Sequence, residues 1–395
     1  MKKQFPFFQN NPQTVYLDNA ASTQLPQTVI KAINKYISSS HSNIHRGLYK
    51  QSEQNTNEYE AIRQIVMQYL NASNHQLIYT AGATEAANLV AYNLGLSLKK
   101  GDQIILAADN HHSSILPFTR LRKEGIVIKF LAINKEGRID LKNLEKLINK
   151  KTKAVVVSHV SNVTGVIHNI KQICDLASKK NILSIVDGAQ AVGHLKVNID
   201  KINCDFYYFS SHKMYGPTGI GALIAKVGLL DSFLPQITGG GTITKVTKRE
   251  VIYADVPTKL EAGTPNLSAI IGLKGTIIWL NKNISKIEKK ERDLTKHLLE
   301  SLNKLGFVSI LGPSNNQSRS GVVSLSIKNI HCHDAAQILA DNNICVRAGH
   351  HCAQITHKYL GQTASLRISI AAYNTREDIN KTIRALKQVK KTFHG

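Results

Sequence analysis

The pattern of apolar and polar positions between about residues 75 and 230 predicts a mostly parallel sheet covered by helices. Short apolar runs alternate there with segments of helical periodicity, and the runs lie at residues 77–80, 103–107, 127–133, 154–160, 183–186, 206–209 and 222–225. Strands that alternate with helices along a chain are typical of α/β folds. Ligands of such sheets bind beyond the carboxyl ends of the strands, so we expect the functional residues at those ends.

The pattern changes after Pro265 and indicates a second, smaller α+β domain. A long helix-like stretch covers residues 268–305, and strand candidates follow near Val308 and at residues 321–327. No internal repeat or linker separates the two parts, so we expect them to pack closely. The predicted organisation is an N-terminal segment packed on the small domain (1–25), a large domain (26–275) and a small C-terminal domain (276–395).

Composition and charge do not change this picture. The chain has 395 residues, 42% of them hydrophobic, which is enough for a substantial core. Its formal charge of +23 raises the question of a nucleic-acid partner, because clustered basic residues gain affinity by releasing counterions from phosphate. The lysines are instead scattered, in segments such as 142–153 and 282–290 that are typical of solvated helix faces. We therefore expect no nucleic-acid surface.

Cysteine usage and the absence of long apolar runs predict a cytoplasmic protein. The first eight residues contain two lysines but no stretch long enough for a signal peptide, and no later run approaches a membrane span. An odd number of widely spaced cysteines is not the pattern of a secreted disulfide framework. We expect reduced thiols at Cys174, Cys204, Cys332, Cys345 and Cys352.

Three segments that follow predicted strands contain candidate cofactor ligands. Residues 80–85 are small and open a helix over 85–94, so their N–H groups could hold a phosphate, although an ordinary capped turn has the same pattern. Asp187 follows a buried strand and needs a cation such as a pyridinium nitrogen, unless it caps a helix. Lys213 could form an imine if burial lowers its pKa, and the alternative is a surface lysine.

The fourth candidate, residues 346–353, places a thiol in the small domain. Cys352 follows two histidines and lies near Arg347, and such surroundings favour the thiolate. Two histidines and a cysteine also raise the alternative of zinc. Adjacent residues cannot easily all point at one ion, and no second ligand group follows, so we expect no metal site.

Taken in order, the motifs resemble the cysteine desulfurases of the class V aminotransferase family, most closely the sulfur-mobilisation (Suf-type) subgroup of iron–sulfur cluster assembly. The resemblance spans almost the whole chain, through residues 16–22, 45–47, 110–112, 159–162, 209–219, 261–266, 346–353 and 366–374. It implies a pyridoxal-phosphate fold of type I, with the cofactor in the large domain and the catalytic cysteine loop in the small one.

The resemblance also implies a role for each matching residue. Lys213 would carry pyridoxal 5'-phosphate as a Schiff base, and Cys352 would be the sulfur nucleophile. His111 would stack on the ring, where Asp187 would pair with the ring nitrogen and Gln190 with the ring hydroxyl. The phosphate ligands would be Thr84, Ser210 and His212, joined by Thr264 from a second subunit, and Ala83 belongs to the same cofactor-binding set. The substrate ligands would be Asn162, Arg367 and Arg347.

The implied reaction converts L-cysteine to L-alanine and leaves a persulfide on Cys352. The implied partners are a second copy of the chain in a homodimer, a small sulfur-acceptor protein and an iron–sulfur scaffold. Three positions depart from the subgroup: Tyr49 in place of a common histidine, Ala83 in place of a second threonine, and Ser211 in place of a glycine. Two of them, Ala83 and Ser211, lie near the expected phosphate site and leave the chemistry intact.

Three alternatives stay open from the sequence. A selenocysteine lyase would use the same lysine and cysteine, whereas another class V transaminase or lyase would use Lys213 without a nucleophilic Cys352. A basic binding protein that keeps only the fold would not develop the cofactor's visible absorbance when pyridoxal phosphate is added.

Overall fold

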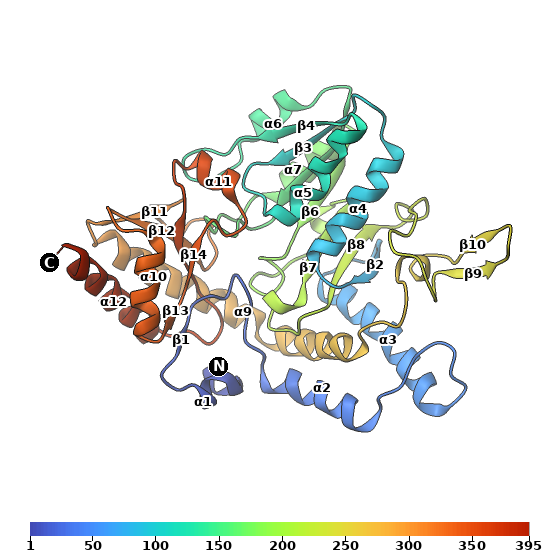
Figure 1. Ribbon diagram of the computed structural model, residues 1–395, viewed down its shortest axis with the longest axis horizontal. Helices are drawn as coiled ribbons and strands as arrows, with labels where there is room; N and C mark the ends of the chain where they lie inside the picture. The colour runs from blue at the N-terminus through green and yellow to red at the C-terminus, as the bar shows by residue number, and fades with distance from the viewer. Residues whose placement is uncertain (395) are drawn as a thin grey trace.

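The computed structural model, which describes residues 1–394, is built around a seven-stranded sheet (Figure 1). From edge to edge the strands are β2 (His75–Thr80), β8 (Gly221–Lys226), β7 (Phe206–Ser210), β6 (Leu183–Asp187), β5 (Thr152–Ser158), β3 (Gln103–Ala107) and β4 (Val127–Leu131). Neighbouring strands are parallel except at β8, which runs antiparallel to β2 and β7. The predicted α/β fold with a mostly parallel sheet is confirmed.

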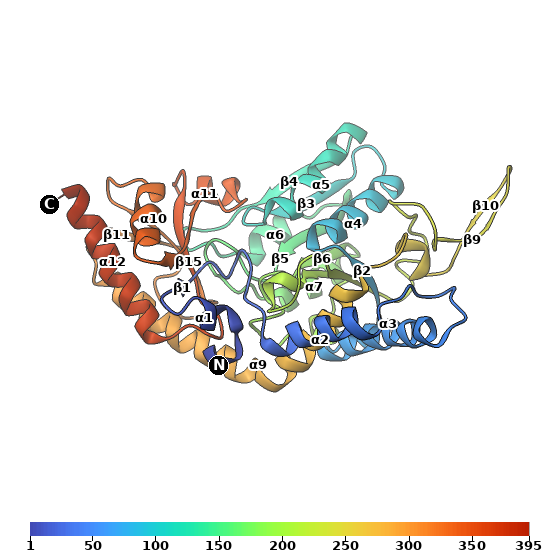
Figure 2. The same ribbon diagram turned by 60° about the horizontal axis from the view of Figure 1, so that its bottom comes forward.

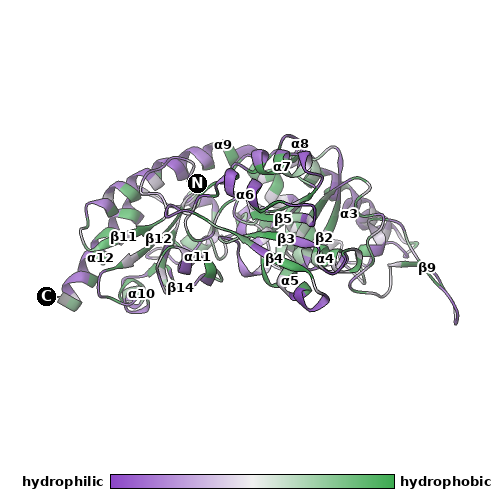
Figure 3. Ribbon diagram, turned by 90° about the horizontal axis from the view of Figure 1, so that it is seen from above, coloured by the Kyte–Doolittle hydropathy of each residue, from purple (hydrophilic) through white to green (hydrophobic). Residues whose placement is uncertain are grey.

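Helices cover both faces of this sheet because successive strand side chains point to opposite sides. Leu77 and Ile105 belong to one buried cluster, and their neighbours Ile78 and Ile104 belong to another. The first cluster includes side chains of α2 (Gln27–Ser39), α3 (Lys50–Tyr69), α6 (Leu141–Leu147), α7 (Ile170–Lys179), α8 (Ile199–Ile202) and α9 (Leu267–Asn303). The second includes α4 (Ala83–Ser97), α5 (Leu116–Thr119) and η3 (Arg120–Glu124). Figure 3 shows the central strands mainly in green and long purple stretches on α9.

A second sheet of four antiparallel strands lies in the C-terminal part of the chain. Its order is β11 (Val308–Leu311), β12 (Val322–Ile327), β15 (Ser365–Ser369) and β14 (Arg347–Gly349). Leu298 of α9, Leu339 of α10 (Cys332–Asp341) and Leu386 of α12 (Arg376–His394) share one buried cluster with strand residues such as Leu366. The small α+β unit therefore has a core of its own.

Helix α9 and the N-terminal segment connect the two sheets. The first part of α9 packs on α2 and α3, and a later part contacts β11 and α12. At the N-terminus, η1 (Lys2–Gln4) and α1 (Pro6–Asn10) precede β1 (Val15–Tyr16), which pairs in parallel with β13 (Ile344–Cys345). Phe5 is fully buried against the rings of Trp279 and Tyr373. The N-terminal segment thus reaches both parts of the molecule (Figure 2).

One arm projects from the body of the molecule, and the sequence pattern did not indicate it. Strands β9 (Ile243–Val246) and β10 (Val251–Tyr253) form this antiparallel hairpin, and η5 (Thr258–Leu260) follows it (Figures 1 and 2). Within residues 1–394, no helix combines the length and apolar character that a bilayer crossing requires.

The predicted elements match the structure well in the central part of the chain. The helix expected at residues 85–94 is α4, and the long helix expected at 268–305 is α9. The domain boundaries stay a prediction. The second of them, at 275/276, falls inside α9, so the change from one part to the other occurs within a single continuous helix.

Candidate active site

Eight of the nine predicted cofactor residues meet in one cavity at the carboxyl ends of the parallel strands. The cavity has a volume of about 220 Å³, and its lining residues come from the segments that follow β2, β3, β5, β6 and β7. They include nine of the predicted site residues, namely Ala83, Thr84, His111, Asn162, Asp187, Gln190, Ser210, His212 and Lys213. Polar groups that are far apart in sequence converge here because every one of these strands ends at the same edge of the sheet.

Lys213 occupies the last position of η4 (Ser211–Lys213), directly after β7, and its backbone is held firmly. The Lys213 carbonyl accepts a hydrogen bond from Nε2 of His194 at 3.2 Å, and the His212 carbonyl accepts one from the N–H of Thr23 at 2.9 Å. Burial lowers the pKa of the Lys213 ammonium, and Arg367 also lowers it, while Asp187 acts in the opposite direction. A lowered pKa leaves more of the free amine that imine formation requires.

The N-terminus of α4 and the end of β7 form one end of the cavity. The N–H of Ala83 donates to Oγ of Ser210 at 2.8 Å, and Thr84 lies in the first turn of the helix. Helix N-termini present free N–H groups and a partial positive charge to an anion. Burial and Lys213 lower the pKa of His212 to about 4, so this ring is neutral at pH 7. These donors suit a phosphate group.

Asp187 also lines the cavity and is a buried carboxylate held by neutral donors. Its Oδ2 accepts from Oγ of Ser114 at 2.6 Å, and its Oδ1 accepts from the N–H of Ala189 at 2.9 Å. Ser114 in turn accepts from the hydroxyl of Tyr208 at 2.8 Å. Among the ion pairs of residues 1–394, none includes Asp187. A buried anion without a cation fits the protonated ring nitrogen of pyridoxal phosphate.

His111 and Gln190 line the same cavity. Nδ1 of His111 accepts from the N–H of Ser113 at 3.1 Å. Burial, assisted by Lys213, lowers the pKa of His111 to about 3, so the ring is neutral and can stack on an aromatic group. Nε2 of Gln190 donates to the Ala20 carbonyl at 2.7 Å, which fixes the side chain. The residues present therefore fit pyridoxal phosphate.

The cysteine loop follows β14 and is held against the cavity from two sides. His351 and Cys352 have φ angles of 52° and 54°, in the left-handed region that non-glycine residues rarely adopt. Asn162 donates through Nδ2 to the His351 carbonyl at 2.7 Å, and the N–H of His112 donates to the Cys352 carbonyl at 2.8 Å. Consecutive strained residues of this kind cluster at functional sites. The Cys352 side chain is exposed, as a nucleophile that meets a substrate or an acceptor must be.

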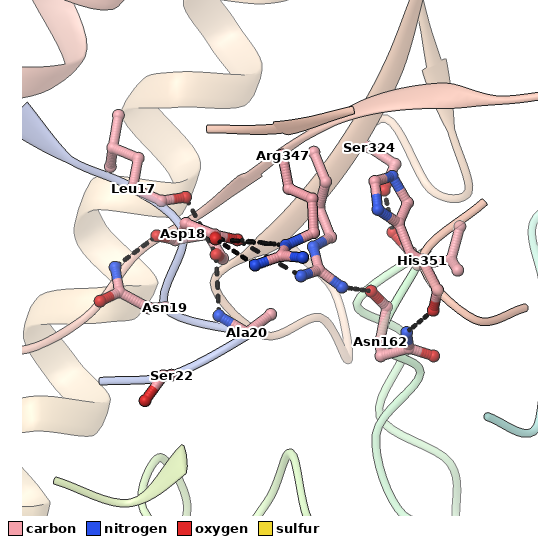
Figure 4. Close-up of polar contacts among 12 residues, drawn as sticks. Leu17, Asp18, Asn19, Ala20, Ser22, Asn162, Ser324, Arg347 and His351 are labelled. Carbon is pink, nitrogen blue, oxygen red and sulfur yellow. Dashed lines mark hydrogen bonds and ion pairs between the residues drawn. The ribbon is translucent and has the colours of Figure 1, made fainter. Parts of the chain in front are cut away.

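The two predicted substrate arginines pair across strands β14 and β15, and Figure 4 shows Arg347 near His351 of this loop. Arg367 is 3% exposed and donates through Nη1 to the Asn162 carbonyl at 3.1 Å, whereas its Nε has no partner in the part of the chain that the structure describes. Burial lowers the pKa of Arg367 to about 10. Arg347 is already bound to Asp18, with Nη2 and Oδ2 2.8 Å apart. Asp18 was not among the predicted site residues.

Thr264 is the predicted cofactor ligand that the single chain does not bring to the cavity. It lines a separate hollow of about 580 Å³ together with His45 and Arg46. Its assignment as a phosphate ligand from a second subunit stays a prediction. No group of three or more His, Cys, Asp or Glu side chains in residues 1–394 is arranged to hold a metal ion.

A buried ion pair beneath Lys213 also lies outside the predicted set. Nδ1 of His194 is 3.0 Å from both carboxylate oxygens of Glu291 on α9, and its Nε2 faces the Lys213 carbonyl. Both partners are acceptors, so both ring nitrogens must donate, and the ring is an imidazolium. Despite burial, which alone would lower it, the pKa of His194 is raised because of Glu291.

Replacing Glu291 with glutamine should therefore destabilise the protein most below pH 6.5. The pair of His194 and Glu291 makes its full contribution to the free energy of unfolding below the pKa that histidine has in the unfolded chain. This contribution is lost as the pH rises through the higher pKa that His194 has in the folded protein. We expect a cost of about 3–5 kcal/mol at pH 6, because loss of one partner leaves the other buried and uncompensated. Thermal unfolding of Glu291→Gln and the unchanged protein from pH 6 to 9 measures this. Glu136→Gln, in an exposed pair with Arg138, is the control, and equal losses at pH 6 and 9 would refute the prediction.

Comparisons with known proteins agree with this geometry. The sequence pattern of the family described as aminotransferase class-V matches residues 15–382. A probable cysteine desulfurase of Halalkalibacterium halodurans is 39% identical over 100% of this chain and 98% of its own length, and one of Staphylococcus aureus (strain Mu50) is 38% identical over 99% and 96%. The solved structure of a cysteine desulfurase of Thermococcus onnurineus NA1 has a TM-score of 0.94 at 37% identity and covers 99% of this chain and 97% of its own. The cysteine desulfurase CsdA of Escherichia coli has a TM-score of 0.90 at 32% identity, with 99% and 98% covered.

The matched region includes every strand of both sheets and every residue of the cavity, and it ends within α12. Because the family pattern covers most of the chain and the relatives match over nearly its whole length, the chain belongs to the class V aminotransferase family.

Proposed function

We propose that this protein is a pyridoxal-phosphate-dependent cysteine desulfurase that converts L-cysteine to L-alanine and takes the sulfur onto Cys352. The observation that carries the proposal is the strained, exposed Cys352 loop, which Asn162 and His112 hold against the cavity of Lys213. The relatives named as cysteine desulfurases, which match over nearly the whole chain, support it.

The chain's own residues supply the parts that this reaction needs. Pyridoxal phosphate, when bound, withdraws electrons from the substrate's α-carbon. The Lys213 amine, with its lowered pKa, takes the α-proton as general base. Arg367 and Asn162 hold the substrate carboxylate. Ser114 and the N–H of Ala189 fix the Asp187 carboxylate, whose negative charge would pair with the ring nitrogen and favour its protonated form.

Transfer of the sulfur from L-cysteine to Cys352 needs no added oxidant. The Cys352 thiolate attacks the substrate sulfur, a sulfur–sulfur bond forms, and the bond between that sulfur and the substrate's β-carbon breaks. The β-carbon keeps the electron pair and gains a proton, so that alanine leaves and the persulfide stays on the enzyme. A thiol reductant or an acceptor protein then removes the sulfur. A cytoplasmic location, a homodimer, a small sulfur-acceptor protein and a place in iron–sulfur cluster assembly complete the proposal.

Turnover of L-cysteine tests the function directly. The purified protein with pyridoxal phosphate and a thiol reductant should release alanine and sulfide in equal amounts. The same assay on L-selenocysteine separates the desulfurase from a selenocysteine lyase, since a dedicated lyase would act on the selenium substrate alone. Turnover confined to selenocysteine, or amino-group transfer without sulfide, would contradict the proposal.

A further inference from the structure

Two arginines lie side by side on neighbouring strands of the small sheet, at the edge of the active site. Arg347 and Arg367 are direct partners in the antiparallel pairing of β14 with β15, so their side chains leave the same face. Like charges directly opposite each other destabilise a sheet unless an anion lies between them. The arrangement therefore requires a carboxylate nearby.

Asp18 supplies that carboxylate and binds the two arginines unequally, and Figure 4 shows its contact with Arg347. Its Oδ1 and Oδ2 lie 3.1 and 3.2 Å from Nε of Arg347, and Oδ2 lies 2.8 Å from Nη2 of the same residue. Nη2 of Arg367 is 3.5 Å from Oδ1, a longer contact. Asp18 thus occupies the edge of the Arg347 guanidinium that carries Nε and Nη2, which is the strong two-point geometry for a guanidinium and a carboxylate.

Hydrogen bonds to the neighbouring strand hold the backbone around Asp18 in place. Asp18 forms an isolated parallel bridge with Ser369, and the Leu17 carbonyl accepts from the N–H of Ser369 at 2.7 Å. The N–H of Ala20 donates to Oγ of Ser369 at 2.9 Å. Asp18 is therefore a rigid anchor, and Arg347 is the residue that it holds in place.

Arg347 opens the strand that leads into the cysteine loop. Gly349 ends β14, and His350, His351 and Cys352 follow directly. Further along the loop, Asn162 and His112 hold the carbonyls of His351 and Cys352. The Asp18 contact is the corresponding anchor at the start of the loop, and it comes from a segment more than 300 residues away in sequence.

The contact between Asp18 and Arg347 gives the two arginines different roles. Asp18 and the two guanidiniums together carry one positive charge, enough for one substrate carboxylate. Asp18 occupies the Nε–Nη2 edge of Arg347, whereas Nε of Arg367 is a buried atom with no partner in residues 1–394 and lies beside the Nη2 that is 3.5 Å from Asp18. Nε and Nη2 share one edge of a guanidinium and can receive a carboxylate with two parallel bonds.

We propose that Asp18 is a positioning residue that anchors the Cys352 loop through Arg347 and keeps that arginine from the substrate carboxylate, so that Arg367 alone receives it. This proposal rests on the proposed function, because it assigns Arg367 to the carboxylate of L-cysteine.

Two variants should change ligand binding in opposite directions. Asp18→Asn frees both arginines and raises the local positive charge, so L-alanine should bind the holoenzyme several-fold more tightly. Arg347→Gln frees Asp18 to bind Arg367, so L-alanine should bind several-fold more weakly. Both variants should lower kcat for L-cysteine, by about 10²-fold if Cys352 moves by about 1 Å. Absorbance titration of the bound cofactor with L-alanine measures the affinity, and steady-state assays give kcat and KM.

Hydrogen exchange gives a readout that does not depend on turnover. The segment 347–353 should exchange faster in both variants, and the double variant should exchange no faster than either single one. Glu136→Gln, in the exposed pair with Arg138, should change neither measurement. Unchanged exchange in both single variants, or a change of L-alanine affinity in the same direction in both, would overturn the proposal. Failure of the unchanged holoenzyme to desulfurate L-cysteine would instead refute the proposed function and leave the exchange result interpretable.

Discussion

Replacing Cys352 with alanine is expected to abolish sulfide release from L-cysteine while the holoenzyme keeps its visible colour. Eight of the nine proposed cofactor residues line the cavity of the large sheet, whereas Cys352 contributes only its backbone carbonyl to the contacts that hold the loop. A thiol is the nucleophile that sulfur transfer needs, and alanine offers none. Loss of a covalent nucleophile costs up to about 10⁶-fold in kcat in well-studied enzymes.

The control for this variant is Cys345→Ala. Cys345 lies in β13 of the same small domain and is partly buried, so its replacement tests a general effect of removing a thiol near the loop. We expect it to keep most of the activity. Release of sulfide by Cys352→Ala at the rate of the unchanged protein would show that Cys352 is not the nucleophile, and would favour a lyase of the same family.

Replacing Lys213 with alanine is expected to remove both the activity and the visible absorbance of the bound cofactor. No other lysine lines the cavity of residues 1–394, so no second amine can form the imine. The variant also removes the general base, a group that contributes about 10²–10⁴-fold in rate. Absorbance spectra after incubation with pyridoxal phosphate, followed by gel filtration, measure the first effect, and the alanine assay measures the second.

Two further variants test whether the cofactor needs the positive charge of Lys213 or its ability to form an imine. Lys213→Arg keeps the positive charge but cannot form an imine, so it should behave like Lys213→Ala. Lys358→Ala removes an exposed lysine of α11 (Gln354–Tyr359), close to the cysteine loop in sequence, and should leave the spectrum unchanged. Retention of the full colour by Lys213→Arg would show that another residue carries the cofactor.

The central sheet and the meeting of the candidate residues in one cavity could be predicted from the sequence for a physical reason. Buried parallel strands are near-continuous apolar runs, and each candidate ligand directly follows one of them. Thr84, Asp187 and Lys213 therefore had to meet at one edge once the sheet formed. The apolar runs do not encode direction, so the antiparallel β8 could not be distinguished from its parallel neighbours.

Other parts of the site depend on tertiary contacts that leave no local pattern. Asp18 meets Arg347 only because β1 pairs with β13 and the Asp18 segment adds to β15. The pair of His194 and Glu291 forms between a loop of the large domain and the middle of α9. In the sequence, isolated charged residues such as Asp18 and Glu291 cannot be distinguished from ordinary surface residues. The motif around residues 16–22 matched the family pattern, but it did not reveal what Asp18 binds.

The mass of the Cys352 peptide after a single turnover tests directly whether Cys352 accepts the sulfur of L-cysteine. The holoenzyme is mixed with an equimolar amount of L-cysteine in the absence of reductant, quenched, alkylated and digested. We expect the peptide containing Cys352 to gain one sulfur atom, the peptides of Cys332 and Cys345 to gain none, and one alanine to form for each sulfur bound. Alanine formed without added sulfur on Cys352 would contradict this expectation.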